Sequence, residues 1–357
     1  MPSLLTIRAD ASTIIGTGHI MRCIALAQAW QDNGGDVTFL SHCESPPLRQ
    51  RIIDEGFDFV PIEKPYLDPN DLKKTLSILS NSTNITNQIN SSTTPWLVVD
   101  GYHFTPDYQR QIKEAGHRLL VIDDMAHLSH YYADVVLNQN INAETLRYSC
   151  EPYTRLLLGT HYVLLRREFL KWKGWKREIP HVARKVLVTL GGGDPDNVTL
   201  KVINALRKFD ISDLDVRIVV GPSNPQKEIL KNAMLYAPCS MRILQNAENM
   251  PELMAWADIA ISAGGSTCWE LAFMGVSTLI ITMAENQKWI GEHLENKCAA
   301  LNLGWFHDLT AEALASSCTT CLRDHDMRAG FLSQAQKLVS HCGPEKIINA
   351  MIQEKEI

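Results

Sequence analysis

The segment Ile259–Glu270 reads Ile-Ala-Ile-Ser-Ala-Gly-Gly-Ser-Thr-Cys-Trp-Glu, and halfway along it an apolar strand pattern gives way to a glycine turn and a helix pattern. Its first four residues are typical of a buried strand, and a helix is expected from Cys268 to Met274. A glycine turn between a strand and a helix leaves backbone N–H groups unpaired at the positive end of the helix. The segment therefore predicts an α/β fold with an anion site after this strand.

The anion expected at this turn is a phosphate. Gly265 lets the backbone approach it closely, and Ser266 or Thr267 either caps the helix or donates to a phosphate oxygen. Glu270, one turn into the helix, is placed to accept hydrogen bonds from ribose hydroxyls. The alternative is that Gly264 and Gly265 only allow close packing of strand and helix.

On both sides of this segment, strand patterns alternate with helix patterns, which predicts βαβ units around mostly parallel sheets. Strands are expected at Leu4–Ala9, Asp36–Ser41, Phe57–Ile62, Trp96–Val99, Arg118–Ile122, Val135–Asn138, Lys185–Leu190, Val216–Val220, Met241–Leu244 and Thr278–Ile281. Helices are expected near residues 20–30, at Val198–Lys208, at Met250–Ala257 and after Pro344.

With 357 residues, the chain is longer than one core usually supports. The charged stretch Leu170–Pro180 is interpreted as a linker between two Rossmann-like domains, residues 1–175 and 180–357, that face each other across a cleft. The final helix is a candidate to pack back on the first domain. The polar stretch Asn81–Pro95 is interpreted as a surface loop.

A second glycine turn, Gly191-Gly192-Gly193-Asp194, follows the first strand of the second half. Gly192 and Gly193 are candidates to bind the same ligand, although a purely structural turn explains them equally well. Neither turn reads G-x-G-x-x-G, and no G-x-x-x-x-G-K-[ST] occurs, so a nucleotide diphosphate fits better than NAD or ATP.

The first strand is followed by a second candidate site, because ligands bind at the carboxyl ends of strands in open α/β sheets. Gly16, Thr17 and Gly18 lead into a helix whose first turn carries His19, with Arg22 one turn later. The helix dipole opposes protonation there, which favours a neutral imidazole that can act as a base. Asp10 either orients His19 or caps the loop.

Further polar residues follow other strands and are candidates for substrate contact. They are Asp100 with Tyr102, Asp123 with Asp124, and Asn286 with Gln287. For the acidic residues, loop capping is an equally good explanation. Arg22 and Tyr162 are further candidates for substrate contact. Tyr162 belongs to the run Gly-x-x-Tyr-x-Leu-Leu-Arg-Arg-Glu-Phe, which is also a candidate hinge near the cleft.

Composition narrows the function classes. A net charge of -6 argues against nucleic acid and anionic membranes as partners. Nine scattered cysteines indicate free thiols, and Cys318 with Cys321 is interpreted as a buried helix face instead of a metal site. With no basic leader and no run of about 18 apolar residues, a cytoplasmic location is expected.

Several of these motifs, in order along nearly the whole chain, resemble the hydrolases that cleave UDP-2,4-diacetamido-2,4,6-trideoxy-β-L-altropyranose in pseudaminic acid biosynthesis. The motifs are Arg-Ala-Asp-Ala-Ser…Gly-Thr-Gly-His-Ile-Met-Arg, Val99–Tyr102, Val121–Asp124, the Tyr162 run, Leu-Gly-Gly-Gly-Asp-Pro, Ser262–Glu270 and Ala284–Gln287.

The resemblance implies a GT-B fold with UDP held mainly by the second domain. It implies hydrolysis without a metal or cofactor, in which water attacks the anomeric carbon with inversion and His19 acts as the general base. A synthase that condenses the free sugar with phosphoenolpyruvate is implied as a partner by pathway only. A related substrate from legionaminic acid or spore-coat polysaccharide synthesis stays open.

Three other functions remain as alternatives. A GT-B glycosyltransferase would use a sugar acceptor instead of water, and a nucleotide-sugar sensor would bind without turnover. A dinucleotide oxidoreductase is the least favoured alternative, because the G-x-G-x-x-G fingerprint of dinucleotide binding is missing.

Overall fold

A computed structural model describes residues 4–12, 14–88, 95–208, 213–221, 224, 226–235, 237–245 and 247–353. The chain divides into two compact units. The first comprises Met1–Arg167 and Cys342–Ile357, and the second comprises Glu168–His341.

The first unit is built on a 7-stranded sheet in the order β3-β2-β1-β4-β5-β6-β7, in which every pairing is parallel. β1, β2, β4 and β6 are buried along their whole length, as expected for strands covered on both faces. The strands are β1 (Leu5–Ala9), β2 (Val37–Ser41), β3 (Asp58–Pro61), β4 (Trp96–Asp100), β5 (Arg118–Ile122), β6 (Val135–Asn138) and β7 (Arg155–Leu158).

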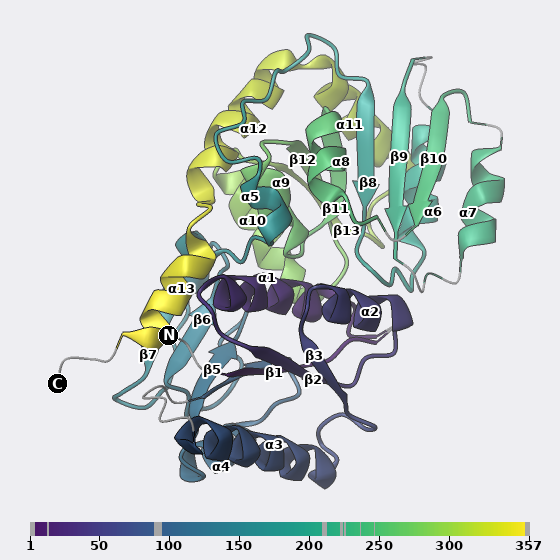
Figure 1. Ribbon diagram of the computed structural model, residues 1–357. Helices are drawn as coiled ribbons and strands as arrows, with labels where there is room; N and C mark the ends of the chain where they lie inside the picture. The colour runs from purple at the N-terminus through teal and green to yellow at the C-terminus, as the bar shows by residue number, and fades with distance from the viewer. Residues whose placement is uncertain are drawn as a thin grey trace. The chain divides into compact units, whose positions relative to one another are not determined.

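Helices cover both faces of this sheet (Figure 1). One face packs against α1 (Gly18–Asp32) and α2 (Pro46–Asp54), and the other packs against α3 (Pro69–Gln88) and α4 (Pro106–Glu114). Short 3-10 turns lie at Ala143–Thr145 and Thr160–Tyr162. The helical pattern predicted near residues 20–30 is α1, and Ile20, Cys23, Ile24, Ala27 and Trp30 are all buried.

The last helix, α13 (Gly343–Ile352), belongs to the first unit although the second unit precedes it in sequence. Ile347, Ile348 and Met351 are almost fully buried in the same core as α1. Gly343 lies so close to the chain before α5 that a Cβ there would meet the carbonyl oxygen of Val163 at 2.1 Å. α13 therefore completes the core of the first unit.

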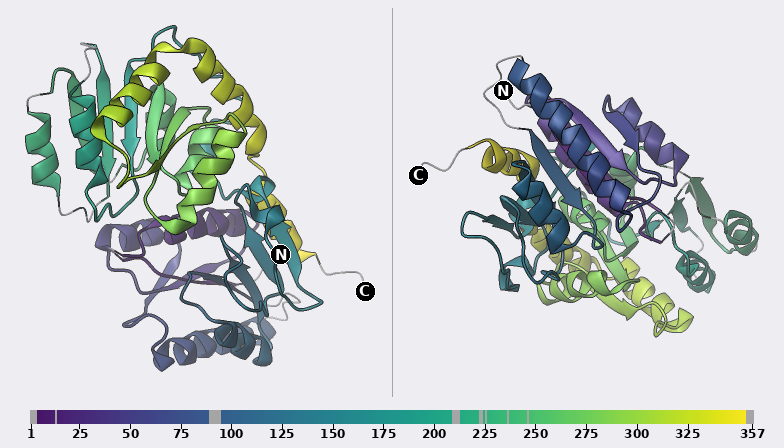
Figure 2. Two further views of the ribbon diagram at one scale, coloured as in Figure 1. Left: turned by 180° about the vertical axis from the view of Figure 1, so that it is seen from behind. Right: turned by 90° about the horizontal axis from the view of Figure 1, so that it is seen from below.

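The second unit repeats the architecture with a 6-stranded parallel sheet in the order β10-β9-β8-β11-β12-β13. Its strands are β8 (Lys185–Thr189), β9 (Asp215–Val220), β10 (Ser240–Gln245), β11 (Ile259–Ala263), β12 (Ser277–Thr282) and β13 (Leu301–Trp305). Its helices, seen from two further sides in Figure 2, are α5 (Arg167–Leu170, which begins at the last residue of the first unit), α6 (Val198–Leu206), α7 (Lys227–Met234), α8 (Met250–Trp256), α9 (Thr267–Phe273), α10 (Glu285–Asn296), α11 (Ala311–Arg323) and α12 (His325–Leu338).

The stretch Leu170–Pro180 is part of the second unit, so its interpretation as a free linker is wrong. Arg177 donates to the carbonyls of Met254, Ala257 and Met274, which follow or end helices α8 and α9. Arg328 donates to the carbonyl of Pro180. An arginine can cap several helix-end carbonyls at once, and these two fasten the stretch to the unit.

The interpretation of Asn81–Pro95 as a loop is also wrong over residues 81–88, because α3 continues to Gln88. Residues 89–94 lie outside the described part. Leu72 and Leu79 anchor the helix at helical spacing in a buried cluster. No Gly or Pro occurs between Asn81 and Gln88, which is compatible with a continuous helix despite the polar composition of this stretch.

Cys318 and Cys321 lie on α11 and are fully buried in the core of the second unit, which confirms their interpretation as a helix face. Burial raises the pKa of Cys321 to about 12, so this thiol stays protonated. Among the helices of the described residues, none has the length and apolar character that a membrane span requires.

Candidate functional site

In the first unit, the carboxyl ends of β1 and β4 lie side by side at the point where the strand order reverses. β1 connects through α1 to β2 on one side, whereas β4 and β5 extend the sheet on the other. Ligands bind at such a switch point in open α/β sheets. The register pairs Ala9 with Asp100, so the loop that follows β1 and leads into α1 starts beside the Asp100 carboxylate.

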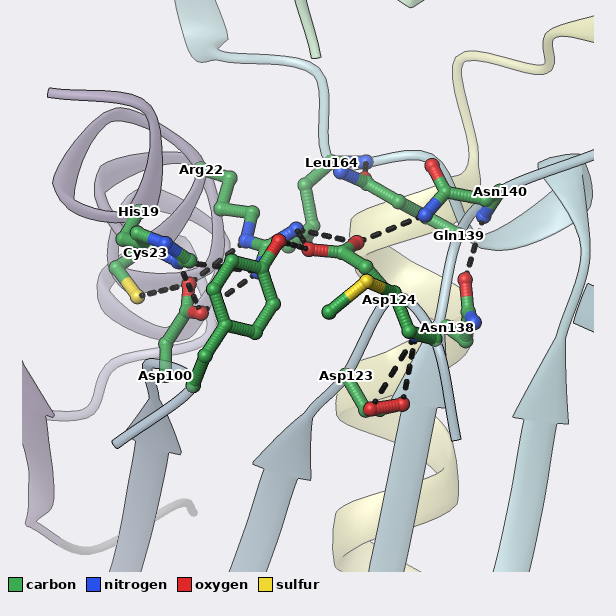
Figure 3. A network of polar contacts seen from close by, with 12 residues as sticks. His19, Arg22, Cys23, Asp100, Asp123, Asp124, Asn138, Gln139, Asn140 and Leu164 are labelled. Atoms are coloured by element: carbon green, nitrogen blue, oxygen red, sulfur yellow. Dashed lines mark hydrogen bonds and ion pairs between the residues drawn. The ribbon is translucent and has the colours of Figure 1, made fainter. Parts of the chain in front are cut away.

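His19 meets that carboxylate. Its Nδ1 lies 2.6 Å from Asp100 Oδ1 (Figure 3). Because a carboxylate only accepts hydrogen bonds, we assign the proton to Nδ1, which leaves the lone pair on Nε2. The ring of Tyr102 packs edge-on against the imidazole at 5.1 Å between centroids. His19 is 8% exposed, and these neighbours are polar, unlike those of a core histidine.

Arg22 lies between two buried carboxylates. Its Nε and Nη2 donate to Asp100 at 2.7 Å, and its Nη1 donates to Asp124 at 2.8 and 3.0 Å. Burial raises the pKa of Asp100, but the charges and hydrogen bonds of Arg22 and His19 together outweigh this effect and hold the pKa well below its usual range. Burial also raises the pKa of Asp124, but the charge of Arg22 and the hydrogen bonds from Arg22 and Tyr102 together outweigh this effect and lower the pKa. Both carboxylates are therefore ionised at neutral pH.

Asp124 accepts two further hydrogen bonds from neutral donors. The hydroxyl of Tyr102 donates to it at 2.5 Å, and Nδ2 of Asn140 donates at 2.8 Å. Asn140 follows β6 in the buried run Asn138-Gln139-Asn140, and its own N–H donates to Asn138 Oδ1 at 2.9 Å. The sequence reasoning missed this run, although three consecutive amides after a buried strand were a usable signal.

These bonds change the roles predicted for Asp100 and Arg22. Asp100 is fully buried, and His19, Arg22 and the thiol of Cys23 surround its oxygens. The guanidinium of Arg22 is likewise taken up by carboxylates. Asp100 and Arg22 therefore hold His19 and each other, and this geometry does not support the prediction that they contact the substrate directly.

The prediction that Asp10 orients His19 is also wrong. Asp10 accepts from Arg8 and from the backbone N–H of His42, and His103 Nε2 lies 3.1 Å away. The carboxylate that holds His19 comes from β4, which neighbours β1 in the sheet although it lies far along the chain. Asp10 instead ties the ends of β1 and β2 together.

The glycines of the loop before α1 have open space around them. Gly16 has φ +78° and its N–H donates to Ser12 O, so it needs the left-handed conformation that glycine tolerates. Neither Gly16 nor Gly18 has an atom within 4 Å of a Cβ position. Thr17 precedes α1 and its side chain makes no capping hydrogen bond. Gly16, Thr17 and Gly18 therefore have the exposure that substrate contact requires.

Asp123 and Tyr162 have structural contacts. Asp123 accepts the N–H groups of Met125 and Ala126 at 3.0 and 2.6 Å, so loop capping is the correct reading for this residue. Tyr162 is partly buried against the core that α13 completes. Its placement supports that helix, and substrate contact by Tyr162 has no geometric support.

In the second unit, the turn Gly264–Thr267 follows β11, next to β8 at the switch point of the second sheet. Cys268 N donates to Gly265 O at 3.0 Å, so the amides of Gly265, Ser266 and Thr267 precede the hydrogen-bond ladder of α9. Gly265 has open space at its Cβ position. Gly264 is different, because a Cβ there would lie 2.8 Å from Gln287 O.

That close approach brings the start of α10 to the same turn. Asn286 lies in the first turn of α10 and Gln287 follows it. Gln287 Oε1 accepts the N–H of Met283 at 3.1 Å, so part of this side chain is used to shape the loop. Glu270 is half-buried in the first turn of α9. Two helix N-termini thus converge where the sequence predicts a phosphate.

The other glycine turn is less suited to an anion. Asp194 accepts the N–H groups of Val198 and Thr199 at 2.8 and 2.9 Å, so a carboxylate already occupies the start of α6. Gly192 packs against Gly221, where a Cβ would meet Gly192 O at 1.9 Å. Gly192 is therefore packed against Gly221, and this geometry does not support the prediction that it binds ligand, whereas the prediction for Gly193 stays a prediction.

The arrangement in the first unit is suited to accepting a proton. It combines an imidazole of defined tautomer with a buried carboxylate that stabilises the imidazolium. Across the residues that the structure describes, no group of three or more His, Cys, Asp or Glu is arranged to hold a metal ion.

Comparison with known proteins gives one family match and several relatives. The model of the glycosyltransferase family 28 C-terminal domain matches residues 186–351. An uncharacterized protein of Methanocaldococcus jannaschii is 27% identical over 80% of this chain and 56% of its own length. The spore coat polysaccharide biosynthesis protein SpsG of Bacillus subtilis is 24% identical over 94% of both chains. The UDP-2,4-diacetamido-2,4,6-trideoxy-beta-L-altropyranose hydrolase of Campylobacter jejuni is 26% identical over 79% of this chain and 92% of its own.

Solved structures show the same fold at low identity. MurG of Acinetobacter baumannii has a TM-score of 0.65 at 15% identity, covering 98% of this chain and 99% of its own. MnaA of S. aureus, solved with UDP, has a TM-score of 0.66 at 10% identity, covering 98% and 95%. With its two parallel Rossmann-like sheets, the chain has the GT-B fold.

Proposed function

We propose that the chain is a nucleotide-sugar-processing enzyme, and specifically a hydrolase that releases UDP and the free sugar from UDP-2,4-diacetamido-2,4,6-trideoxy-β-L-altropyranose. The observation that carries the proposal is the hydrogen bond between His19 Nδ1 and Asp100, which leaves Nε2 as the basic nitrogen at the switch point of the first sheet. The Campylobacter jejuni relative, which bears the name of this hydrolase, supports the choice of substrate.

In the proposed reaction, the Nε2 of His19 accepts a proton from water while the water oxygen bonds to the anomeric carbon. The bond between that carbon and the diphosphate oxygen breaks, and its electron pair leaves with UDP. Asp100 stabilises the imidazolium, and a positioned base of this kind contributes about 10²–10⁴-fold in rate. Gly16, Thr17, Gly18 and the ring of Tyr102 surround His19 and are the proposed sugar contacts.

The second unit is proposed to bind UDP. The amides of Gly265, Ser266 and Thr267 precede the ladder of α9, and the N-terminus of α10 with Asn286 adjoins them. Both favour the negative charge that develops on the leaving diphosphate. Glu270 is the proposed partner of the ribose hydroxyls.

A glycosyltransferase is the second candidate, favoured by the family 28 match over residues 186–351 and by the likeness to MurG. The same imidazole would then deprotonate an acceptor hydroxyl. In both candidate reactions His19 deprotonates the nucleophile, which is water in the hydrolase and the acceptor hydroxyl in the glycosyltransferase.

The deciding experiment follows the purified protein with a panel of UDP-sugars by ³¹P and ¹H NMR in H₂¹⁸O. Hydrolysis at carbon predicts free sugar with ¹⁸O on the anomeric hydroxyl and no label in UDP. Label in UDP would contradict attack at carbon. UDP release that begins only after a sugar acceptor is added would establish the transferase instead.

Two variants separate the roles of the two units. His19→Ala is expected to lose most turnover while UDP affinity stays nearly unchanged. Glu270→Ala is expected to weaken UDP binding by about 1.5–3 kcal/mol, the worth of a charge-assisted hydrogen bond. Normal kcat in His19→Ala would remove His19 from the mechanism, and unchanged UDP affinity in Glu270→Ala would place the ribose elsewhere.

A further inference from the structure

The buried cluster around His19 contains one more carboxylate than holding the imidazole requires. The groups that contact His19 are Asp100 at the end of β4, Arg22 on α1 and Tyr102 in the loop after Asp100. The thiol of Cys23 on α1 contacts Asp100. Asp124, which follows β5, is linked to His19 by the hydrogen bond from Arg22 (Figure 3) and by the hydrogen bond from Tyr102.

We propose that Asp124 is a positioning residue that sets the proton affinity of His19 by neutralising Arg22. The consequence for catalysis rests on the proposed function, whereas the effect on the imidazole does not.

Charge balance within the buried cluster favours protonation of His19 when Asp124 is present. If Arg22 faced Asp100 alone, the pair would be neutral, and a proton taken up by His19 would leave an uncompensated positive charge. With Asp124 present, the cluster carries one negative charge while His19 is neutral and none once His19 is protonated. Uncompensated charge is costly where water is excluded, so the second carboxylate favours proton uptake.

The surroundings keep Asp124 available for this role. Its partners besides Arg22 are Asn140 at 2.8 Å and Tyr102 at 2.5 Å, which donate hydrogen bonds but add no positive charge. Such donors stabilise the ionised carboxylate. Arg22 reaches it through Nη1, while Nε and Nη2 stay on Asp100, so the two carboxylates share the guanidinium without competing for a donor.

The test is an NMR titration of the His19 ring, assigned by its absence in His19→Ala, which needs no turnover. In Asp124→Asn, Arg22 is no longer neutralised, and the pH midpoint of His19 is expected to fall by about one unit, as for a unit charge brought close. Arg22→Gln removes the positive charge instead, so its midpoint is expected to rise. The double variant is expected to lie close to the unmodified protein, and Asp107→Asn, an exposed carboxylate on α4, is expected to change nothing.

Opposite shifts in the two single variants are not expected from a merely structural role. The proposal is overturned if the midpoint stays put in folded Asp124→Asn, or if both single variants shift the same way. If Asp124→Asn does not fold, Asp124→Ser removes the same charge with a smaller side chain, and its midpoint is expected to fall in the same way. Hydrolysis of UDP-sugars with unmoved midpoints would refute this proposal and leave the proposed function intact, whereas the expected shifts without hydrolysis would do the reverse.

Discussion

Replacing Asp100 by Asn tests how His19 is held. The change keeps the shape of the side chain but turns one acceptor oxygen into an NH₂ group. Asp100 Oδ1 accepts from His19 and from Arg22 Nη2, and Oδ2 accepts from Arg22 Nε. Whichever way the amide lies, one of its N–H groups faces a donor of Arg22.

The magnitude follows from these contacts. If the NH₂ group faces His19, it forces Nδ1 to accept, and the proton moves to Nε2, which then cannot act as a base. If the amide oxygen faces His19, the tautomer is kept but the charge that stabilises the imidazolium is lost. We therefore expect kcat to fall by up to the whole contribution of the base, about 10²–10⁴-fold, which corresponds to about 3–5 kcal/mol in the activation barrier.

The assay measures kcat from UDP release and reads the tautomer from the ¹⁵N shifts of the His19 ring. UDP affinity is expected to stay unchanged, because the proposed UDP contacts lie in the second unit. Asp107→Asn serves as the matched control, since that carboxylate is exposed. An unchanged kcat in a folded Asp100→Asn protein, with the proton still on Nδ1, would refute the reasoning.

Three further predictions concern stability. Ile347→Ala in α13 empties a fully buried position and should lower the stability of the first unit by about 3 kcal/mol, whereas Ile352→Ala on the same helix, at a residue that is 40% exposed, should cost far less. Hydrogen exchange of the β1 and β8 amides reports the stability of the first and second unit separately. Equal losses in the two units for Ile347→Ala would contradict this prediction. Burial raises the pKa of Asp10, but its hydrogen bond with His103 and the charge of Arg8 outweigh this and lower the pKa from 3.8 to about 2. The ionised carboxylate therefore adds about 2 kcal/mol above pH 3.8 that is lost as the pH falls toward 2, so acid unfolding should be less steep in Asp10→Asn. Thr310 caps α11 by accepting a hydrogen bond from the N–H of Ala313 at 3.1 Å. Thr310→Ala should therefore lower the midpoint of urea unfolding of the second unit by the equivalent of about 1 kcal/mol. An unchanged midpoint would mean that the cap contributes nothing to stability.

Local patterns were sufficient for much of the fold. The apolar strands and the glycine turns predict two parallel α/β halves, and the strand order and the GT-B likeness confirm that architecture. Strands β7 and β13 were not predicted. β7 (Arg155–Leu158) has only four residues, so its apolar run is too short to distinguish a strand from a buried helix, and the pattern of β13 (Leu301–Trp305) is interrupted by Asn302 and Gly304.

The boundaries between the units depended on contacts that are distant in sequence. Charge and the presence of Gly and Pro made Leu170–Pro180 resemble a linker, but Arg177 and Arg328 attach it to helix ends of the second unit. The sequence made the final helix a candidate to pack back on the first domain, and the burial of its apolar residues in the core with α1 agrees with that prediction.

The sequence by itself determined that His19 begins a helix after a glycine turn, because that pattern is local and has a local physical cause. Only the tertiary structure decided which carboxylate holds it. Asp10 is close in the chain but bonds to Arg8, whereas Asp100 reaches His19 because parallel pairing of β1 with β4 brings the two strand ends to the same edge. The second carboxylate, Asp124, joins through Arg22 for the same reason, since β5 is the next strand in that sheet.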